Sequence, residues 1–197
     1  MDAAQPHIEV RGLTMAYGSR VIQKDLDFTV NRGDIFVIMG GSGCGKSTLL
    51  KLLALIERPT RGQVIVGGRP LGKLGYHEIP AYRQQIGMVF QDNRLLNDRS
   101  AFENVALPLI ISGIGHREVG KRVRAALDQV GLLDREKYPP RSLSAGEQQR
   151  LSIARAVVSR PKVLIADEPT GNLDPDLSLE IMTLFRRLNE VGVTMLI

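Results

Sequence analysis

Eight consecutive residues, from Gly40 to Ser47, carry the clearest chemistry in this chain. They read Gly-Gly-Ser-Gly-Cys-Gly-Lys-Ser and fit the phosphate-binding pattern G-x-x-x-x-G-K-[ST]. Glycines let backbone N–H groups turn inward around phosphate oxygens, Lys46 places a cation at the β- and γ-phosphates, and Ser47 offers a hydroxyl to Mg²⁺. An apolar run precedes the loop and a helical pattern follows it, so we expect a triphosphate to be bound by Gly40, Gly41, Ser42, Gly43, Cys44, Gly45, Lys46, Ser47 and Thr48.

A pair of carboxylates, Asp167 and Glu168, follows the apolar run 163–166. Beside a phosphate-binding loop, such an Asp holds Mg²⁺ directly or through water, and the next carboxylate can orient or deprotonate the attacking water. Alone the pair is a weak signal, because carboxylates at strand ends are common and often only cap or solvate the strand. The loop at 40–47 favours the catalytic interpretation.

A third motif, at residues 143–150, reads Leu-Ser-Ala-Gly-Glu-Gln-Gln-Arg. Ser144 and Glu147 form a capping-box pattern, which predicts that a helix begins there. The Ser144 hydroxyl and the Gly146 N–H would then lie at a helix N-terminus, which favours anions. Ser144 could serve only as a cap, but capping and phosphate binding are compatible.

These groups need strands and helices to position them. Apolar runs and helical spacing alternate along the chain, which indicates an α/β fold with a mostly parallel sheet. The predicted strands cover 8–10, 26–30, 35–39, 63–66, 86–90, 163–166 and 193–197, with the last one central in the sheet. The predicted helices cover 46–56, a segment starting near Ala101 at a second capping box, 119–130, and 145–159.

Composition narrows the function classes. The chain has 197 residues, 43% apolar and 24% charged, which suits one globular domain and excludes disordered, collagen-like and coiled-coil classes. Trp is absent and aromatic residues make up 5%, so no stacking surface for single-stranded nucleic acid, and no nucleic-acid partner, is expected. Cys44 is the single cysteine, which excludes an internal disulfide, and we interpret it as a small residue that fits the loop.

The apolar stretches are too short to cross a bilayer, which takes about 18–20 residues. The first residues lack the basic and then apolar pattern of a signal peptide. We therefore expect a cytoplasmic protein that is peripheral on the inner face of the cell membrane through a partner.

The net charge is +5, and basic residues gather between positions 58 and 83. That segment contains one acidic residue, Glu78, and five basic residues: Arg58, Arg61, Arg69, Lys73 and Arg83. A solvated surface explains such a segment, and the functional alternatives are an anionic lipid, a phosphate ligand or an acidic partner.

Residues 143–150 resemble the signature motif Leu-Ser-Gly-Gly-Gln of the ATP-binding-cassette (ABC) family, and the resemblance extends over nearly the whole chain. Tyr17 matches the aromatic residue that stacks on adenine, and Gln91 matches the Q-loop glutamine that contacts Mg²⁺ or water. Residues 171–174, ending at Asp174, match the D-loop that crosses the dimer interface. The resemblance implies a P-loop core with an N-terminal antiparallel β-lobe and an inserted helical subdomain, divided as 1–91, 92–141 and 142–197.

The resemblance also implies MgATP hydrolysis by a head-to-tail homodimer. The loop of one chain would face Ser144 and Gly146 of the other, with Asp174 beside the same nucleotide. The implied catalytic residues are Glu168, Gln91 and Lys46, and the implied Mg²⁺ ligands are Ser47, Gln91 and Asp167.

Several segments resemble the cell-division (FtsE-type) branch of the family: 57–60, 83–87, 93–99, 104–109 and 166–174. That branch implies an integral membrane partner, an FtsX-like permease, docked at the Q-loop and the helical subdomain, with Leu95, Leu96 and Phe102 lining its groove. The alternatives are ATPases of lipoprotein-releasing or peptide-export transporters and, on the loop 40–44, of phospholipid-trafficking ones. A different class is an ATP-switched regulatory protein with little turnover that signals through a membrane protein to cell-wall enzymes.

Two departures from the family pattern stand out. Ala145 replaces the first signature glycine. The sequence also stops at Ile197, before the family's switch histidine, and His7, His77 and His116 cannot replace it by position. We therefore expect a truncated chain that binds ATP, hydrolyses it poorly and exposes a strand edge.

Overall fold

The structure, a computed structural model, describes residues 6–41 and 43–197 and contains two sheets. The first sheet is antiparallel, in the order β2-β1-β4-β5. Its strands are β1 (Pro6–Tyr17), β2 (Arg20–Asn31), β4 (Arg61–Val66) and β5 (Arg69–Pro70). Strands β1 and β2 are longer than the sequence predicted, because their polar, half-exposed positions extend the pairing beyond the apolar runs. The expected antiparallel β-lobe is confirmed.

The second sheet is parallel, in the order β3-β8-β7-β6. Its strands are β3 (Ile35–Phe36), β8 (Thr194–Leu196), β7 (Val163–Ala166) and β6 (Ile86–Val89). Strand β8 lies between β3 and β7, as predicted for 193–197. The predicted strand 35–39 is shorter than expected, although the Ile38 N–H still donates to the Ile197 carbonyl at 2.7 Å.

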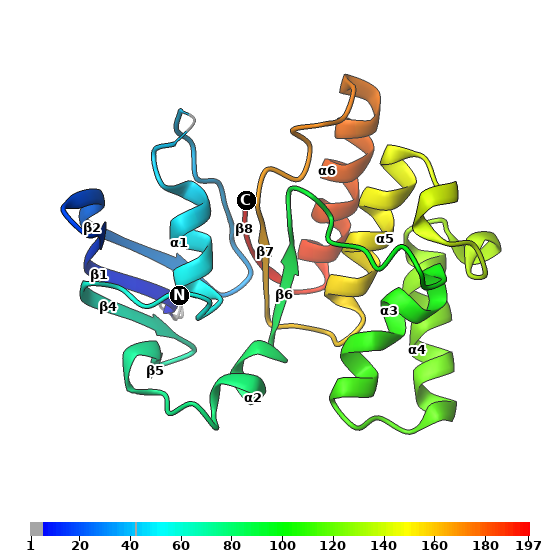
Figure 1. Cartoon of the computed structure of the whole chain (residues 1–197), viewed down its shortest axis with the longest axis horizontal. Coiled ribbons are helices and arrows are strands. Elements are labelled where there is room, and N and C mark those ends of the chain that lie inside the picture. Colours follow the sequence, from blue (N-terminus) through cyan, green and yellow to red (C-terminus); the bar gives the residue numbers. More distant parts are fainter. Residues whose placement is uncertain (1–5, 42) are drawn as a thin grey trace.

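Each face of the parallel sheet packs on a different core. In β7, Val163 and Ile165 pack with α1 (Lys46–Leu53) and the antiparallel sheet, whereas Leu164 and Ala166 pack with the helices on the other side. Figure 1 shows α1 on one side of β6–β8 and α5 and α6 on the other. All four β7 residues are buried, which explains a continuous apolar run instead of an alternating one.

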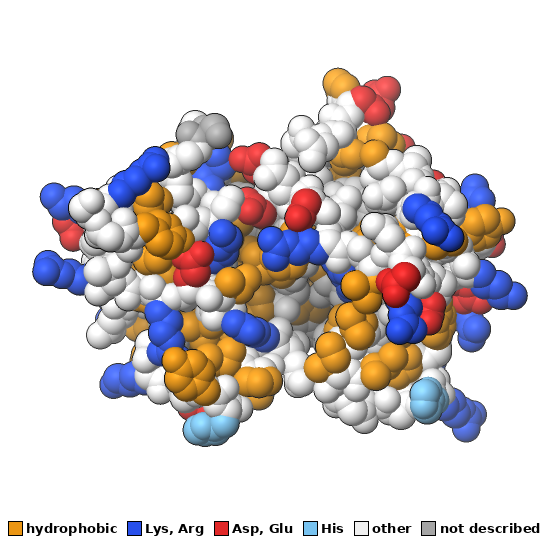
Figure 2. Space-filling view, in the orientation of Figure 1, with side chains coloured by type: hydrophobic (Ala, Val, Ile, Leu, Met, Phe, Trp, Pro, Cys, Tyr) orange, Lys and Arg blue, Asp and Glu red, His pale blue; other side chains and the backbone are white. Residues whose placement is uncertain are grey.

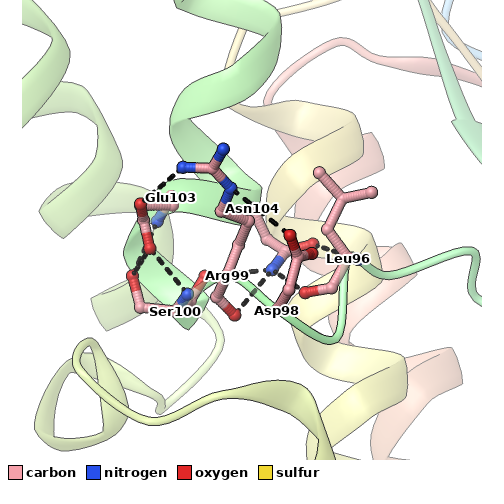
Figure 3. Close-up of polar contacts among 6 residues, drawn as sticks. All are labelled: Leu96, Asp98, Arg99, Ser100, Glu103 and Asn104. Atoms are coloured by element: carbon pink, nitrogen blue, oxygen red, sulfur yellow. Dashed lines mark hydrogen bonds and ion pairs between the residues drawn. The ribbon is translucent and has the colours of Figure 1, made fainter.

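Two helices lie in the helical region expected at 92–141, α3 (Ala101–Ile111) and α4 (His116–Gln129), and the helix expected from residue 145, α5 (Ala145–Val157), packs against both. Both predicted capping boxes are present, at Ser100–Glu103 and at Ser144–Glu147. Figure 3 shows the first box beside Asn104, a fully buried amide that donates to the Leu96 and Ser100 carbonyls at 3.0 Å each. Local side-chain bonds therefore anchor the starts of α3 and α5, whereas α4 begins after Gly115 without a side-chain cap. The boundaries of the helical region at 92 and 141 stay predictions.

Four further short elements complete the fold: α2 (Ile79–Arg83) and the 3₁₀ turns Leu71–Lys73, Leu133–Arg135 and Pro140–Ser142. Helix α6 (Pro175–Glu190) was not predicted from the sequence. Its signals are nevertheless present, because Asp174 caps it, Pro175 starts it, and its buried residues follow helical spacing at Ile181, Leu184, Phe185 and Leu188. None of the described helices is long and apolar enough to cross a bilayer.

Candidate nucleotide-binding site

The predicted phosphate-binding loop connects β3 to α1. Gly45 takes a φ of 96° at the N-cap of α1, in the left-handed region that favours glycine. A Cβ at this position would come within 2.6 Å of Gln23 Nε2, and that amide donates to the Cys44 carbonyl at 2.9 Å. Gln23 thus braces the loop from β2, a role that the sequence analysis missed. Ser42, predicted to belong to the loop, lies outside the described residues.

The Lys46 side chain bonds to two backbone carbonyls of its own loop. Its ammonium donates to the Gly40 carbonyl at 2.7 Å and to the Gly41 carbonyl at 3.3 Å. It also pairs with Glu168 Oε1 at 3.3 Å. The predicted cation and the predicted base are therefore in direct contact.

Glu168 takes a φ of 46° directly after the residue that follows β7. A non-glycine residue in this region costs about 1–3 kcal/mol and persists only where its surroundings hold it. Here Lys46 holds one carboxylate oxygen, and Gln91 Nε2 donates to the other at 3.1 Å. Gln91 follows β6 and Glu168 follows β7, so the carboxyl ends of adjacent parallel strands bring them together.

The predicted Mg²⁺ ligands also meet. Ser47 Oγ donates to Asp167 Oδ1 at 3.0 Å, and both line a cavity of about 530 Å³ together with Gln91. A hydroxyl and a carboxylate are hard oxygen donors, and Mg²⁺ in phosphate sites takes one or two carboxylates plus phosphates and water. The residues present therefore fit this ion.

Tyr17 lies at the exposed end of β1, with 47% of its surface exposed. Its hydroxyl donates to a Glu57 carboxylate oxygen, and this hydrogen bond raises the pKa of Tyr17. Glu57 in turn pairs with Lys51 of α1 at 3.8 Å, which links Tyr17 to the helix that follows the phosphate-binding loop. The expected stacking of Tyr17 on adenine stays a prediction.

Ser144 and Gly146 sit at the start of α5, away from the loop. The Ser144 hydroxyl accepts from the Glu147 N–H at 3.2 Å, and Glu147 accepts from the Ser144 N–H at 2.8 Å. The latter bond lowers the pKa of Glu147. Gly146 faces α6, where a Cβ would come within 3.0 Å of a Leu177 methyl. Since α1 and α5 cover opposite sides of the parallel sheet, these groups do not join Lys46 within one chain (Figure 1).

Asp174 caps α6, accepting from the Leu177 N–H at 3.0 Å. The structure gives it this local contact, and its expected place across a dimer interface stays a prediction. Arg155 is a contact that the sequence analysis missed: it donates to the Asn93 carbonyl at 2.5 Å and to the Arg94 carbonyl at 2.7 Å. The only indication of this role in the sequence is that Arg155 is a charged residue among mostly apolar residues in the second half of α5.

Comparison with known proteins agrees with this geometry. The family model described as ABC transporter matches residues 23–171. The cell division ATP-binding protein FtsE of Escherichia coli K12 is 50% identical over 190 residues, covering 96% of this chain and 86% of that protein. The methionine import ATP-binding protein MetN of Leifsonia xyli is 42% identical over 97% of this chain and 57% of its own length.

Among solved structures, the dimeric post-hydrolysis state of the ATP-binding cassette MJ0796, bound to ADP and Pi, superimposes with a TM-score of 0.87 at 34% identity. The match covers 96% of this chain and 86% of that one. The chain belongs to the ABC transporter family. The predicted fold class is confirmed, and so is the prediction of an ATP-binding ATPase.

Proposed function

We propose that this chain is the ATP-hydrolysing subunit of a bacterial cell-division ABC complex, held on the inner face of the membrane by an FtsX-like permease. The observation that carries the hydrolytic part is the convergence of Lys46, Gln91 and Glu168, next to the Ser47–Asp167 pair. The higher identity to FtsE than to MetN supports the cell-division branch.

When ATP binds, the ion pair between Lys46 and Glu168 has to break so that Lys46 can bind a phosphate oxygen. Glu168 now presents its negative charge to Lys46, at the position where a phosphate oxygen would compete for the same ammonium. The triphosphate would accept backbone N–H groups at the start of α1 and gain the positive end of that helix. Adenine would stack on the exposed Tyr17 ring.

Ser47, Asp167 and Gln91 would hold Mg²⁺. When bound, this ion supplies positive charge to the β- and γ-phosphate oxygens. Lys46 supplies a second positive charge, directly from the protein.

Glu168, released from Lys46, would then act on water. Its carboxylate takes a proton from the water, whose oxygen forms a bond to the γ-phosphorus. The bond from that phosphorus to the β,γ-bridging oxygen breaks, and ADP leaves with the electron pair. Gln91 orients the water because its amide already reaches Glu168 at 3.1 Å.

A second copy of the chain would complete each site. Ser144 and Gly146 lie apart from Lys46 in one chain, and α5 presents free N–H groups at its start. A head-to-tail dimer brings these groups to the γ-phosphate of the opposite copy, so two ATP molecules link the protomers. The dimeric MJ0796 cassette supports this arrangement.

The permease would dock in a groove formed by α2, β6, α3 and α5. This groove has a volume of about 550 Å³ and is lined by Arg83, Phe90, Leu107, Pro108 and Ile111, among others. Figure 2 shows hydrophobic side chains on both sides of the hollow in this face. The expected lining residues Leu95 and Phe102 pack instead against the helical core.

Co-purification with a co-expressed FtsX-like permease tests the proposed complex. The wild-type chain should retain the permease, and the double substitution Leu107→Asp/Ile111→Asp should lose most of it while ATP binding is kept. Leu179→Asp is the matched control, since Leu179 is as exposed as Ile111 but lies on α6.

Stimulation of ATPase activity by the permease is the second readout. Capture by the methionine importer's membrane subunit, with no capture by the FtsX-like permease, would contradict the cell-division assignment. Equal retention by both Asp variants would place the docking surface elsewhere.

A further inference from the structure

A second cavity lies at the opposite end of the parallel sheet from the nucleotide site. It has a volume of about 270 Å³ and opens where β6 and β7 begin, at Ile86 and Val163. Gln91 and Asp167 follow the other ends of the same strands. The two sites are therefore separated by the length of the sheet.

The lining of this cavity is strongly basic. Arg32 comes from the turn before β3, Arg69 from β5, and Lys162 from the residue before β7. No Asp or Glu lines it, and within 6–41 and 43–197 none of the three cations has a side-chain hydrogen bond or ion pair. By contrast, Arg122 and Arg150 elsewhere on the surface each pair with a glutamate.

His7 forms the wall of the cavity and is 4% exposed. Its backbone carbonyl accepts from the Gly67 N–H at 2.7 Å, but its ring has no hydrogen-bond partner among the residues that the structure describes. Burial and then the charges of Arg32 and Lys162 lower the pKa of His7, so the ring is neutral near pH 7. A neutral imidazole offers one N–H to a ligand and can take up a proton when an anion arrives.

The other polar lining residues are already engaged. The Tyr82 hydroxyl donates to the Leu53 carbonyl, and the Gln85 amide donates to the Ala81 carbonyl. Free donor capacity in the cavity therefore belongs to two guanidinium groups, one ammonium and one imidazole. Guanidinium groups bind phosphate oxygens in bidentate fashion, which suits a tetrahedral dianion.

We propose that this cavity binds a phosphate group, as free phosphate or as the headgroup of an anionic lipid. Clustered cations without counter-charges repel one another, and a dianion among them removes that repulsion. A phosphate group with a few waters fits the volume, because one water takes about 30 Å³. The proposal does not depend on ATP hydrolysis, since it uses none of the residues at the nucleotide site.

NMR titration of the His7 ring with inorganic phosphate tests the proposal in a Lys46→Ala background, where the phosphate-binding loop is impaired. We expect the ring signal to shift with phosphate and the pKa of His7 to rise, since the dianion offsets the charges of Arg32, Arg69 and Lys162. The ring signals of Tyr82, which also lines the cavity, serve as a check that the ring environment is otherwise unchanged.

Arg32→Ala/Arg69→Ala should weaken the phosphate response at His7 at least about tenfold, as expected for losing two charge-assisted contacts. The matched control is Arg61→Ala/Lys73→Ala, two exposed cations of the same basic segment that do not line the cavity. Both double variants, made without Lys46→Ala, should bind ATP like the unmodified chain. Equal loss in the control pair, or no response at His7, would overturn the proposal.

A further arm identifies the source of the phosphate. Flotation with phosphatidic acid vesicles, compared with phosphatidylcholine vesicles, supports a lipid headgroup if Arg32→Ala/Arg69→Ala abolishes it. A response to inorganic phosphate alone supports a soluble ligand.

Discussion

The phosphate-binding loop and the start of α5, which carries Ser144, are held in different ways, although both are expected to contact ATP, the start of α5 contacting the nucleotide of the opposite copy. At the loop, side chains from distant segments bond to one another: Lys46 to Glu168, and Ser47 to Asp167. At the start of α5, the Ser144 and Glu147 side chains bond to backbone groups of their own turn, and Glu147 also pairs with Arg135 at 3.5 Å.

This difference predicts two kinds of response to substitution. The loop must exchange protein contacts for phosphate contacts, so changes there alter ligand affinity and rate. The start of α5 needs no rearrangement, so changes there alter helix stability first and alter function only where a second copy contacts it.

The largest effect is expected from Lys46→Ala. Losing a charge-assisted contact with phosphate costs about 1.5–3 kcal/mol, which corresponds to an affinity loss of about 10- to 100-fold. Titration with a fluorescent ATP analogue measures this loss, and circular dichroism should show an intact fold. Lys121→Ala, on the exposed side of α4, is the control and should bind normally. Unchanged affinity in Lys46→Ala would show that the loop does not bind the triphosphate.

Glu168→Gln should separate binding from chemistry at the same loop. Removing the proposed base lowers the hydrolysis rate by about 10²–10⁴-fold. ATP affinity should rise at the same time, because Lys46 no longer pairs with a carboxylate. Phosphate release and ATP binding are measured side by side, with Glu190→Gln as the control on α6. A fall in both quantities would argue that Glu168 serves to hold Lys46 in place.

The chemistry of the site could be predicted from the sequence because the residues that carry it lie in short motifs. The loop, the Asp167–Glu168 pair and both capping boxes depend on residues a few positions apart, and the structure contains all of them. Helix α6 has equally local signals in its cap at Asp174, its proline at Pro175 and the helical spacing of its apolar residues.

Other features depend on how distant segments pack, and no local pattern encodes them. Gln23 braces the loop from β2, and Arg155 reaches the Asn93 and Arg94 carbonyls from α5. The lining of the proposed docking groove likewise follows from which faces of α3 the core buries, so Leu107 and Ile111 line it while Phe102 packs inward. Each of these contacts is decided by tertiary packing.

Comparing Ser144→Ala with Ser100→Ala tests whether Ser144, at the start of α5, does more than cap its helix. Both substitutions remove an N-cap from a complete capping box, so each should cost about 1 kcal/mol, or about 2–4 °C in Tm for a chain of this size. Only Ser144→Ala should also weaken ATP-dependent dimerisation of the Glu168→Gln chain, as measured by size-exclusion chromatography. Equal dimerisation of the two variants would show that Ser144 serves only as a helix cap.

The smallest effect concerns acid stability of the two capping boxes. Hydrogen bonds from the Ser100 and Ser144 N–H groups lower the pKa of Glu103 and of Glu147 from the ordinary 4.5. A carboxylate with a lowered folded-state pKa contributes stability that is complete above its ordinary value and is lost as pH falls through the lowered value. Thermal unfolding between pH 6 and 3 should therefore decline more steeply for the wild-type chain than for Glu103→Gln/Glu147→Gln, since glutamine keeps the capping bond without titrating. The same slope in both chains would show that these boxes contribute nothing that depends on charge.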